Sequence, residues 1–115
     1  MKKIITGIIA IGFALAGSAL AHSMVKSSNI SSGDAFSSSP ETFEIEFSHE
    51  AGLADVTLET TDGDDVDIGF GGEDDMTSEF SVDLPDLESG DYLLTWRAVA
   101  MDGHVMSDTI DFTVE

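Results

Sequence analysis

The sequence predicts a small all-β domain, a β-sandwich or small barrel, that follows a secretory leader. Three observations support this fold class. Apolar and polar residues alternate with a period of two in several short runs, as they do in strands that bury one face. Clusters of Gly, Pro, Asp and Ser separate these runs at short intervals, which is typical of sandwiches and barrels. No segment after the leader has a helical period of apolar residues.

The first 21 residues are predicted to be a signal peptide. The chain opens with the positive region Met1-Lys2-Lys3, continues with an apolar run from Ile4 to about Gly17, and reaches the small-x-small motif Ala19-Leu20-Ala21. This is the layout of a secretory signal peptide. The alternative is an uncleaved membrane anchor, but the run is shorter than the ~20 apolar residues that a spanning helix needs. We therefore predict cleavage before His22, which leaves one domain of residues 22–115.

The expected elements follow the alternation in chain order. The serine-rich segment 23–39 is expected to be irregular, with one short strand at Met24 to Ser28. Further strands are expected at 41–47, 56–58, 66–70, 80–84, 92–100 and 110–114, with turns at 48–52, 61–64, 71–75, 85–90 and 102–103. The run 92–100 is more uniformly apolar than the others, as a central strand would be, and its Tyr92 and Trp96 are expected in the core.

The charge of the chain is strongly negative. All 23 acidic residues follow the leader, and only Lys26 and Arg97 oppose them there, so residues 22–115 carry −21 with His neutral. Such a field repels nucleic acid and anionic membranes, which we exclude as partners. Most of these carboxylates fit a solvated surface suited to salty surroundings; the alternative is attraction of cations to a site. Cysteine is absent, which excludes disulfides and thiolate metal sites.

His22 becomes the amino terminus if the leader is removed as predicted. Its α-amine and ring Nδ1 then form a six-membered chelate from a single residue, so metal binding orders little additional chain. An α-amine ordinarily has a pKa of about 8, so a metal near neutrality displaces a weakly held proton. Two nitrogens in a fixed bite favour a tetragonal centre, which Cu(II) prefers.

A second nitrogen donor has two candidates, His49 and His104. His104 follows Asp102 and Gly103, and alternate residues of an extended segment face the same side, so Asp102 and His104 are predicted to face one metal. The competing interpretation is a simple Asp-Gly hairpin turn. His49 is either a residue that orients a ligand or an exposed loop histidine. The methionines that flank these positions, Met24, Met101 and Met106, either assist Cu(I), which thioethers prefer, or only pack.

The chain resembles the CopC family of periplasmic copper-binding and copper resistance proteins. Three blocks carry the resemblance: "HSMVKSSNISSG", "SPETFEIEFS" and "LPDLESGDYLLTWRAVAMDGHVMSDTIDFTV". The last is the most specific, with Leu-Pro-x-Leu, Gly-x-Tyr, Trp-Arg, Asp-Gly-His and Phe-Thr-Val in order. The chain departs from the pattern at Ile30 and Asp108, both of which are expected at turns. It also lacks a methionine-rich run, since Met76 stands alone between Phe47 and Leu84, so a separate Cu(I) site of that kind is not expected.

The resemblance implies a seven-stranded Ig-like or cupredoxin-like Greek-key sandwich and one Cu(II) per chain. The implied ligands are His22, through its amine and ring, Asp102 and His104. It further implies a monomeric periplasmic protein for copper homeostasis or resistance that passes copper to an inner-membrane transporter of the CopD type. The alternative is a copper-dependent oxidative enzyme with a His-first site; the short chain with one Trp and one Tyr favours a binding protein instead. A third alternative is a sandwich whose histidines bind nothing specific.

Overall fold

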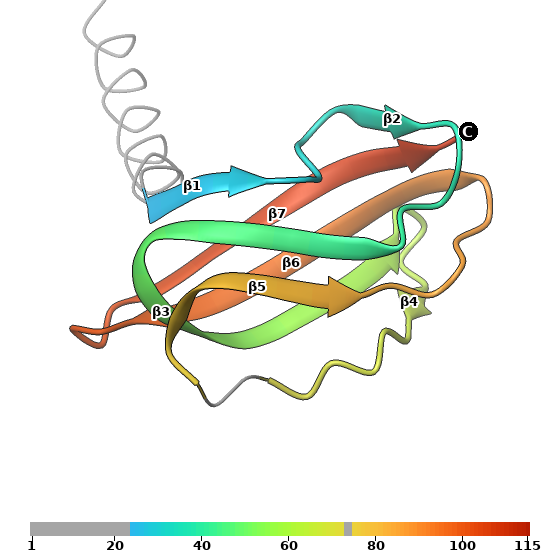
Figure 1. Ribbon diagram of the computed structural model, residues 1–115. Coiled ribbons are helices and arrows are strands. Elements are labelled where there is room, and N and C mark those ends of the chain that lie inside the picture. Colours follow the sequence, from blue (N-terminus) through green and yellow to red (C-terminus); the bar gives the residue numbers. More distant parts are fainter. Residues whose placement is uncertain (1–23, 73–74) are drawn as a thin grey trace, which may run out of the picture.

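The computed structural model describes residues 24–72 and 75–115, and this part of the chain is an all-β sandwich (Figure 1). Its strands are β1 (Val25–Ser28), β2 (Asp34–Phe36), β3 (Thr42–Thr60), β4 (Asp65–Val66), β5 (Thr77–Asp83), β6 (Gly90–Ala100) and β7 (Val105–Val114). The predicted fold class is thereby confirmed. The predicted signal peptide, residues 1–21, lies outside the described residues. Among the described residues there is no helix with the length and apolarity to cross a bilayer.

The long strand β3 belongs to both layers of the sandwich. Its first half, 42–47, pairs with β1 on one side and β5 on the other. Its second half, from Ala51 onward, pairs with β6 and, near its end, with β4. The second layer continues from β6 to β7 and then β2, which runs parallel to β7. In Figure 1, β3 runs to one end of the molecule, bends there and returns in the other layer.

The bend of β3 corrects the predicted turn at 48–52. These residues remain in strand conformation, and the ladder shifts between Glu46 and Ala51, where β3 changes partners. Ala51 itself lies opposite both Thr77 of β5 and Ala100 of β6. Three smaller corrections apply. β2 forms inside the segment expected to be irregular, and the strand expected at 66–70 is limited to β4. Asp108, expected at a turn, lies within β7 opposite Trp96.

The core is built from the inward-facing residues of both layers. On β6, Tyr92 and Trp96 are 5% and 1% exposed, which confirms their predicted burial. The Trp96 ring meets Phe47 of the opposite layer edge-on, with centroids 5.4 Å apart, and Phe47 in turn meets Phe80 at 6.0 Å. Burying each such aromatic ring contributes about 1.5–3 kcal/mol, so alternation and aromatic packing hold the layers together without a disulfide.

Three segments meet at the end of the sandwich where β3 bends. The start of β1 lies there because Val25 pairs with Phe47, and the β6–β7 hairpin lies there because Ala100 pairs with Ala51. Figure 1 shows the start of β1, the bend and the hairpin tip at this same end. The sequence motif at 102–104 therefore lies at the end of the sandwich where β3 bends, beside the first described residues of the chain.

Candidate metal centre

The loop between β6 and β7 is a three-residue hairpin turn. The N–H of Ala100 donates to the carbonyl of His104 at 2.8 Å, and the N–H of Gly103 donates to the carbonyl of Ala100 at 2.9 Å. Gly103 has φ of +89°, the left-handed conformation that such loops require and that glycine adopts without a steric penalty. The predicted turn at 102–103 is confirmed, and it brings the side chains on either side of the glycine toward each other.

Asp102 and His104 are brought together by this turn. Oδ2 of Asp102 lies 2.7 Å from Nδ1 of His104, and Oδ1 of Asp102 accepts the backbone N–H of His104 at 3.1 Å. Both side chains remain open to solvent, with 63% of Asp102 and 84% of His104 exposed. The two side chains thus lie together because of the turn and not because of an extended segment, and their binding to one metal stays a prediction.

The electrostatics of the pair favour an ionised carboxylate. The hydrogen bond from the His104 backbone N–H, and then the one from its ring, hold the pKa of Asp102 below its usual value. An ionised carboxylate only accepts hydrogen bonds, so Nδ1 of His104 carries the shared proton and donates it. When the ring is neutral, this arrangement leaves the lone pair on Nε2 of His104, and the carboxylate fixes the orientation of the ring.

A second loop of the molecule has the same backbone turn without a histidine. In the β3–β4 loop, Thr60 N–H donates to Asp64 O at 2.8 Å, and Gly63 N–H donates to Thr60 O at 2.9 Å. Gly63 has φ of +96°, so this loop matches the β6–β7 loop in its two backbone hydrogen bonds and also contains Asp-Gly, although the N–H of Asp64 donates to Thr60 Oγ1 and not to Asp62. It has Asp64 where the other has His104. The imidazole donor is therefore what distinguishes the β6–β7 loop chemically.

A hollow of about 240 Å³ adjoins the Asp102–His104 pair. It is lined by residues from both layers: Met24, Ala100, Asp102, His104, Val105 and Met106. Met24 immediately precedes β1, whereas the others belong to β6, β7 and their loop. Polar donors stand at the exposed rim, and thioether and aliphatic groups form the rest of the wall. Met24 and Met106 flank the predicted ligands in sequence, but their shared hollow depends on the packing of the two layers.

The other predicted donors are placed as follows. His22 lies outside the described residues. His49 is exposed on the bend of β3 and is not among the residues that line the hollow. Within residues 24–72 and 75–115, no three His, Asp or Glu side chains come together as a ready metal site. The described residues thus contribute a two-residue pair, and a complete Cu(II) site needs donors from elsewhere.

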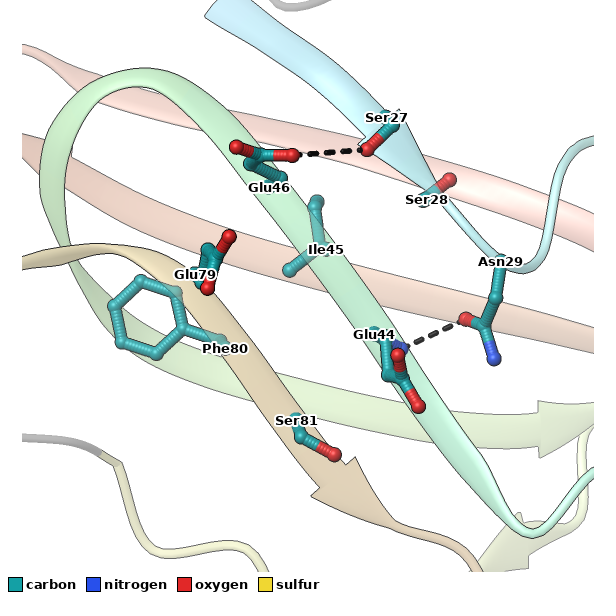
Figure 2. Close-up of a pocket in the computed structure, with 9 residues that line it drawn as sticks. All are labelled: Ser27, Ser28, Asn29, Glu44, Ile45, Glu46, Glu79, Phe80 and Ser81. Atoms are coloured by element: carbon teal, nitrogen blue, oxygen red, sulfur yellow. Dashed lines mark hydrogen bonds between the residues drawn. The ribbon is translucent and has the colours of Figure 1, made fainter.

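A larger hollow lies away from this pair, on the outer face of β1, β3 and β5. It measures about 600 Å³, and Figure 2 shows three carboxylates along it, Glu44, Glu46 and Glu79. Glu46 lies opposite Glu79 in the strand register and is 3.6 Å from Nζ of Lys26. We interpret this hollow as part of the acidic surface, because three carboxylates line it and two of them, Glu46 and Glu79, are like charges directly opposed.

This opposition predicts a salt-dependent gain in stability for Glu79→Gln. Like charges directly opposite in an antiparallel pair are destabilising by roughly 0.2–1 kcal/mol, so removal of one should raise the free energy of unfolding at low salt. The gain should vanish near 1 M salt, where the screening length is about 3 Å. Urea unfolding at low and high salt measures it. Glu88→Gln, in an exposed loop, is the control; equal gains in both variants would contradict a local cross-strand cause.

Comparisons with known proteins agree with this architecture. A family model for the CopC domain matches residues 25–115. The structure is similar to that of CopC from Methylosinus trichosporium OB3b, with TM-score 0.67 and 25% identity over 82% of this chain and 94% of that one. It is also similar to PcoC, a copper resistance protein from Escherichia coli, with TM-score 0.54 and 23% identity over 79% and 98%. No curated protein sequence matches significantly. The matched segment covers the whole sandwich, and the chain therefore belongs to the CopC family.

Proposed function

We propose that the protein is a periplasmic copper carrier that is exported by cleavage after Ala21 and binds one Cu(II) per monomer. The observation that carries this proposal is the Asp102–His104 pair in the β6–β7 loop, in a chain of the CopC family. The proposed ligands are the amine and ring of His22, the imidazole of His104 and a carboxylate oxygen of Asp102. Three nitrogens and one oxygen complete the tetragonal set that Cu(II) prefers.

The position of Met24 supports the participation of His22. Met24 lines the hollow beside Asp102 and His104, and His22 precedes it by two residues. Two residues of extended chain span at most about 7 Å. This short connection is compatible with a site in which the amine and ring of His22 join Asp102 and His104.

The separation within the pair suits two neighbouring ligands of one copper ion. Donors bonded at about 2.0 Å and at right angles to one another are about 2.8 Å apart, close to the 2.7 Å between Asp102 Oδ2 and His104 Nδ1. We propose that Asp102 Oδ2 and His104 Nδ1 would hold Cu(II) in place of the shared proton. The competing arrangement keeps the proton, binds copper through Nε2 of His104, and leaves Asp102 as the group that orients the ring.

The substitution Asp102→Asn is expected to weaken Cu(II) binding by about 10–100-fold, less than the loss of His104. Asparagine removes the charge but keeps an oxygen that can accept the His104 N–H, so the turn should persist. A competition titration with a Cu(II) chelator measures the change. Asp62→Asn is the matched control, because it removes one charge from the equivalent position of the β3–β4 loop. Equal small losses in both variants would mean that only the net charge matters.

A carrier must also release its copper to a recipient, and an exposed site favours this transfer. His104 and Asp102 are largely open to solvent, so a partner's ligands can approach the ion while it is still held. We propose that the recipient is a membrane copper transporter of the CopD type. Exposed Met101 and Val105, 71% and 63% accessible, flank the pair at the hairpin tip and provide apolar contact area beside the ion.

The carrier is tested against the alternative of an oxidative enzyme. The copper-loaded protein is supplied with a reductant, oxygen or peroxide and a panel of polysaccharides, and in parallel with an apo-acceptor or copper-depleted membranes. We expect transfer of copper without turnover. Copper-dependent formation of oxidised oligosaccharides at catalytic rates, abolished by His104→Ala, would refute the carrier. Intact mass of the exported protein checks the start at His22; any other first residue would remove the chelate.

A further inference from the structure

The hollow beside Asp102 and His104 contains two kinds of donor at different depths. Its rim has the carboxylate and the imidazole, both well exposed, whereas its wall has two thioethers, Met24 and Met106. Met106 is 9% exposed and Met24 is half-buried. The carboxylate, a hard donor, and the imidazole, an intermediate one, are therefore exposed to water. The two thioethers, which are soft donors, are more buried.

The two methionines come from opposite layers of the sandwich. Met24 precedes β1, which pairs with the first half of β3, and Met106 lies on β7, opposite Ala98 of β6. His104 is two residues before Met106 and lines the same hollow, so an imidazole and a thioether are supplied by one strand and its turn, and a second thioether by the facing layer. Three soft or intermediate donors from both layers therefore line one hollow.

The chemistry of this donor set is that of a site for a soft, singly charged cation. Thioethers select Cu(I) over harder divalent ions. The desolvation cost of an ion grows with the square of its charge, so a monovalent ion enters an apolar hollow far more readily than a divalent one. Ala100 and Val105 provide that apolar lining. The rim thus suits Cu(II), and the interior suits Cu(I).

We propose that the hollow is a Cu(I) site formed by the thioether sulfurs of Met24 and Met106 with the imidazole of His104. The proposal rests on the proposed copper function and extends it to the reduced ion. His104 is shared by the two sites, so the chain holds one copper in either oxidation state. The competing role for the two methionines is packing alone, which flexible thioethers also serve.

The test compares Met24→Leu and Met106→Leu in the exported protein. Leucine conserves volume and usually costs less than about 1.5 kcal/mol, so both variants should fold, which circular dichroism verifies. Anaerobic competition with a chromophoric Cu(I) chelator should show affinity lowered by at least about tenfold in each variant, as expected for a lost ligand. Cu(II) affinity should be unchanged. Met101→Leu, at the exposed tip of the same hairpin, is the matched control and should bind Cu(I) as wild type does.

A second measurement does not depend on substitution. In protein labelled at the methionine methyl groups, Ag(I), a redox-inert substitute for Cu(I), should shift the NMR signals of Met24 and Met106 and leave those of Met76 and Met101 in place. Wild-type Cu(I) affinity in both leucine variants, or Ag(I) shifts at Met76 or Met101 instead, would overturn the proposal. Failure of the Cu(II) function is seen separately, as a Cu(II) titration that His104→Ala does not change.

Discussion

Replacement of His104 by alanine is expected to weaken Cu(II) binding by at least about a hundredfold, because loss of a direct ligand should exceed the 10–100-fold cost of losing a supporting group. The substitution removes the imidazole that distinguishes this loop from the β3–β4 loop, while the exposed side chain (84% accessible) contributes little to packing. Stability should therefore be nearly unchanged. Chelator competition gives the affinity, and frozen-solution EPR should show the loss of one nitrogen from the hyperfine pattern.

An independent variant addresses the other half of the proposed site. One additional residue before His22 moves the α-amine out of the six-membered chelate and should weaken Cu(II) binding to a similar degree. His49→Ala is the control, since His49 is not among the residues that line the hollow and its loss should leave the EPR pattern as it is. If both the extended protein and His104→Ala titrate like wild type, the proposed ligands are wrong.

Trp96→Ala is expected to have the largest effect on stability. Trp96 is 1% exposed on the central strand β6, and its ring packs edge-on against Phe47 of the other layer. Truncation of a buried Trp costs about 3–5 kcal/mol, a large share of the 5–15 kcal/mol that stabilises a typical domain. The thermal midpoint should fall by more than about 12 °C, as measured by circular dichroism.

The matched control for Trp96→Ala is Phe70→Ala. Phe70 is also aromatic but only half-buried, in the irregular segment after β4, so its truncation leaves a smaller cavity and should cost less. A midpoint for Trp96→Ala that is no lower than that of Phe70→Ala would contradict a core centred on the contact between β6 and the bend of β3.

Elements with a strong local pattern could be predicted from the sequence. Alternation placed β5 and β7, and the uniformly apolar run placed the central strand β6, because burial of one or both faces leaves a direct trace in the residue order. The bend of β3 could not be predicted in this way. Ser48 to Gly52 is polar and ends in glycine, like a turn, yet it stays extended because each half of β3 pairs with different distant strands.

The remaining differences have the same origin in non-local pairing. β2 has three residues and forms because it pairs with β7 in parallel. The local order of apolar and polar residues does not predict such a long-range pairing. Ile68 and Phe70 alternate as strand residues do, but beyond β4 they are half-buried without a ladder. At the candidate site, the Asp-Gly-His motif was readable because one turn contains it. The common hollow of Met24 and Met106 was not, since it depends on how two layers stack.

The bend of β3 also affects how the sandwich can move. One continuous, hydrogen-bonded strand joins the layers at the end that contains Asp102 and His104, whereas irregular segments, 37–41 and 84–89, join them at the opposite end. We therefore expect the two layers to move least relative to each other near the bend, where their separation would break paired backbone hydrogen bonds. Met24 and His104, which come from different layers, lie at that end. The proposed copper sites are thus expected where the two layers best keep their relative position.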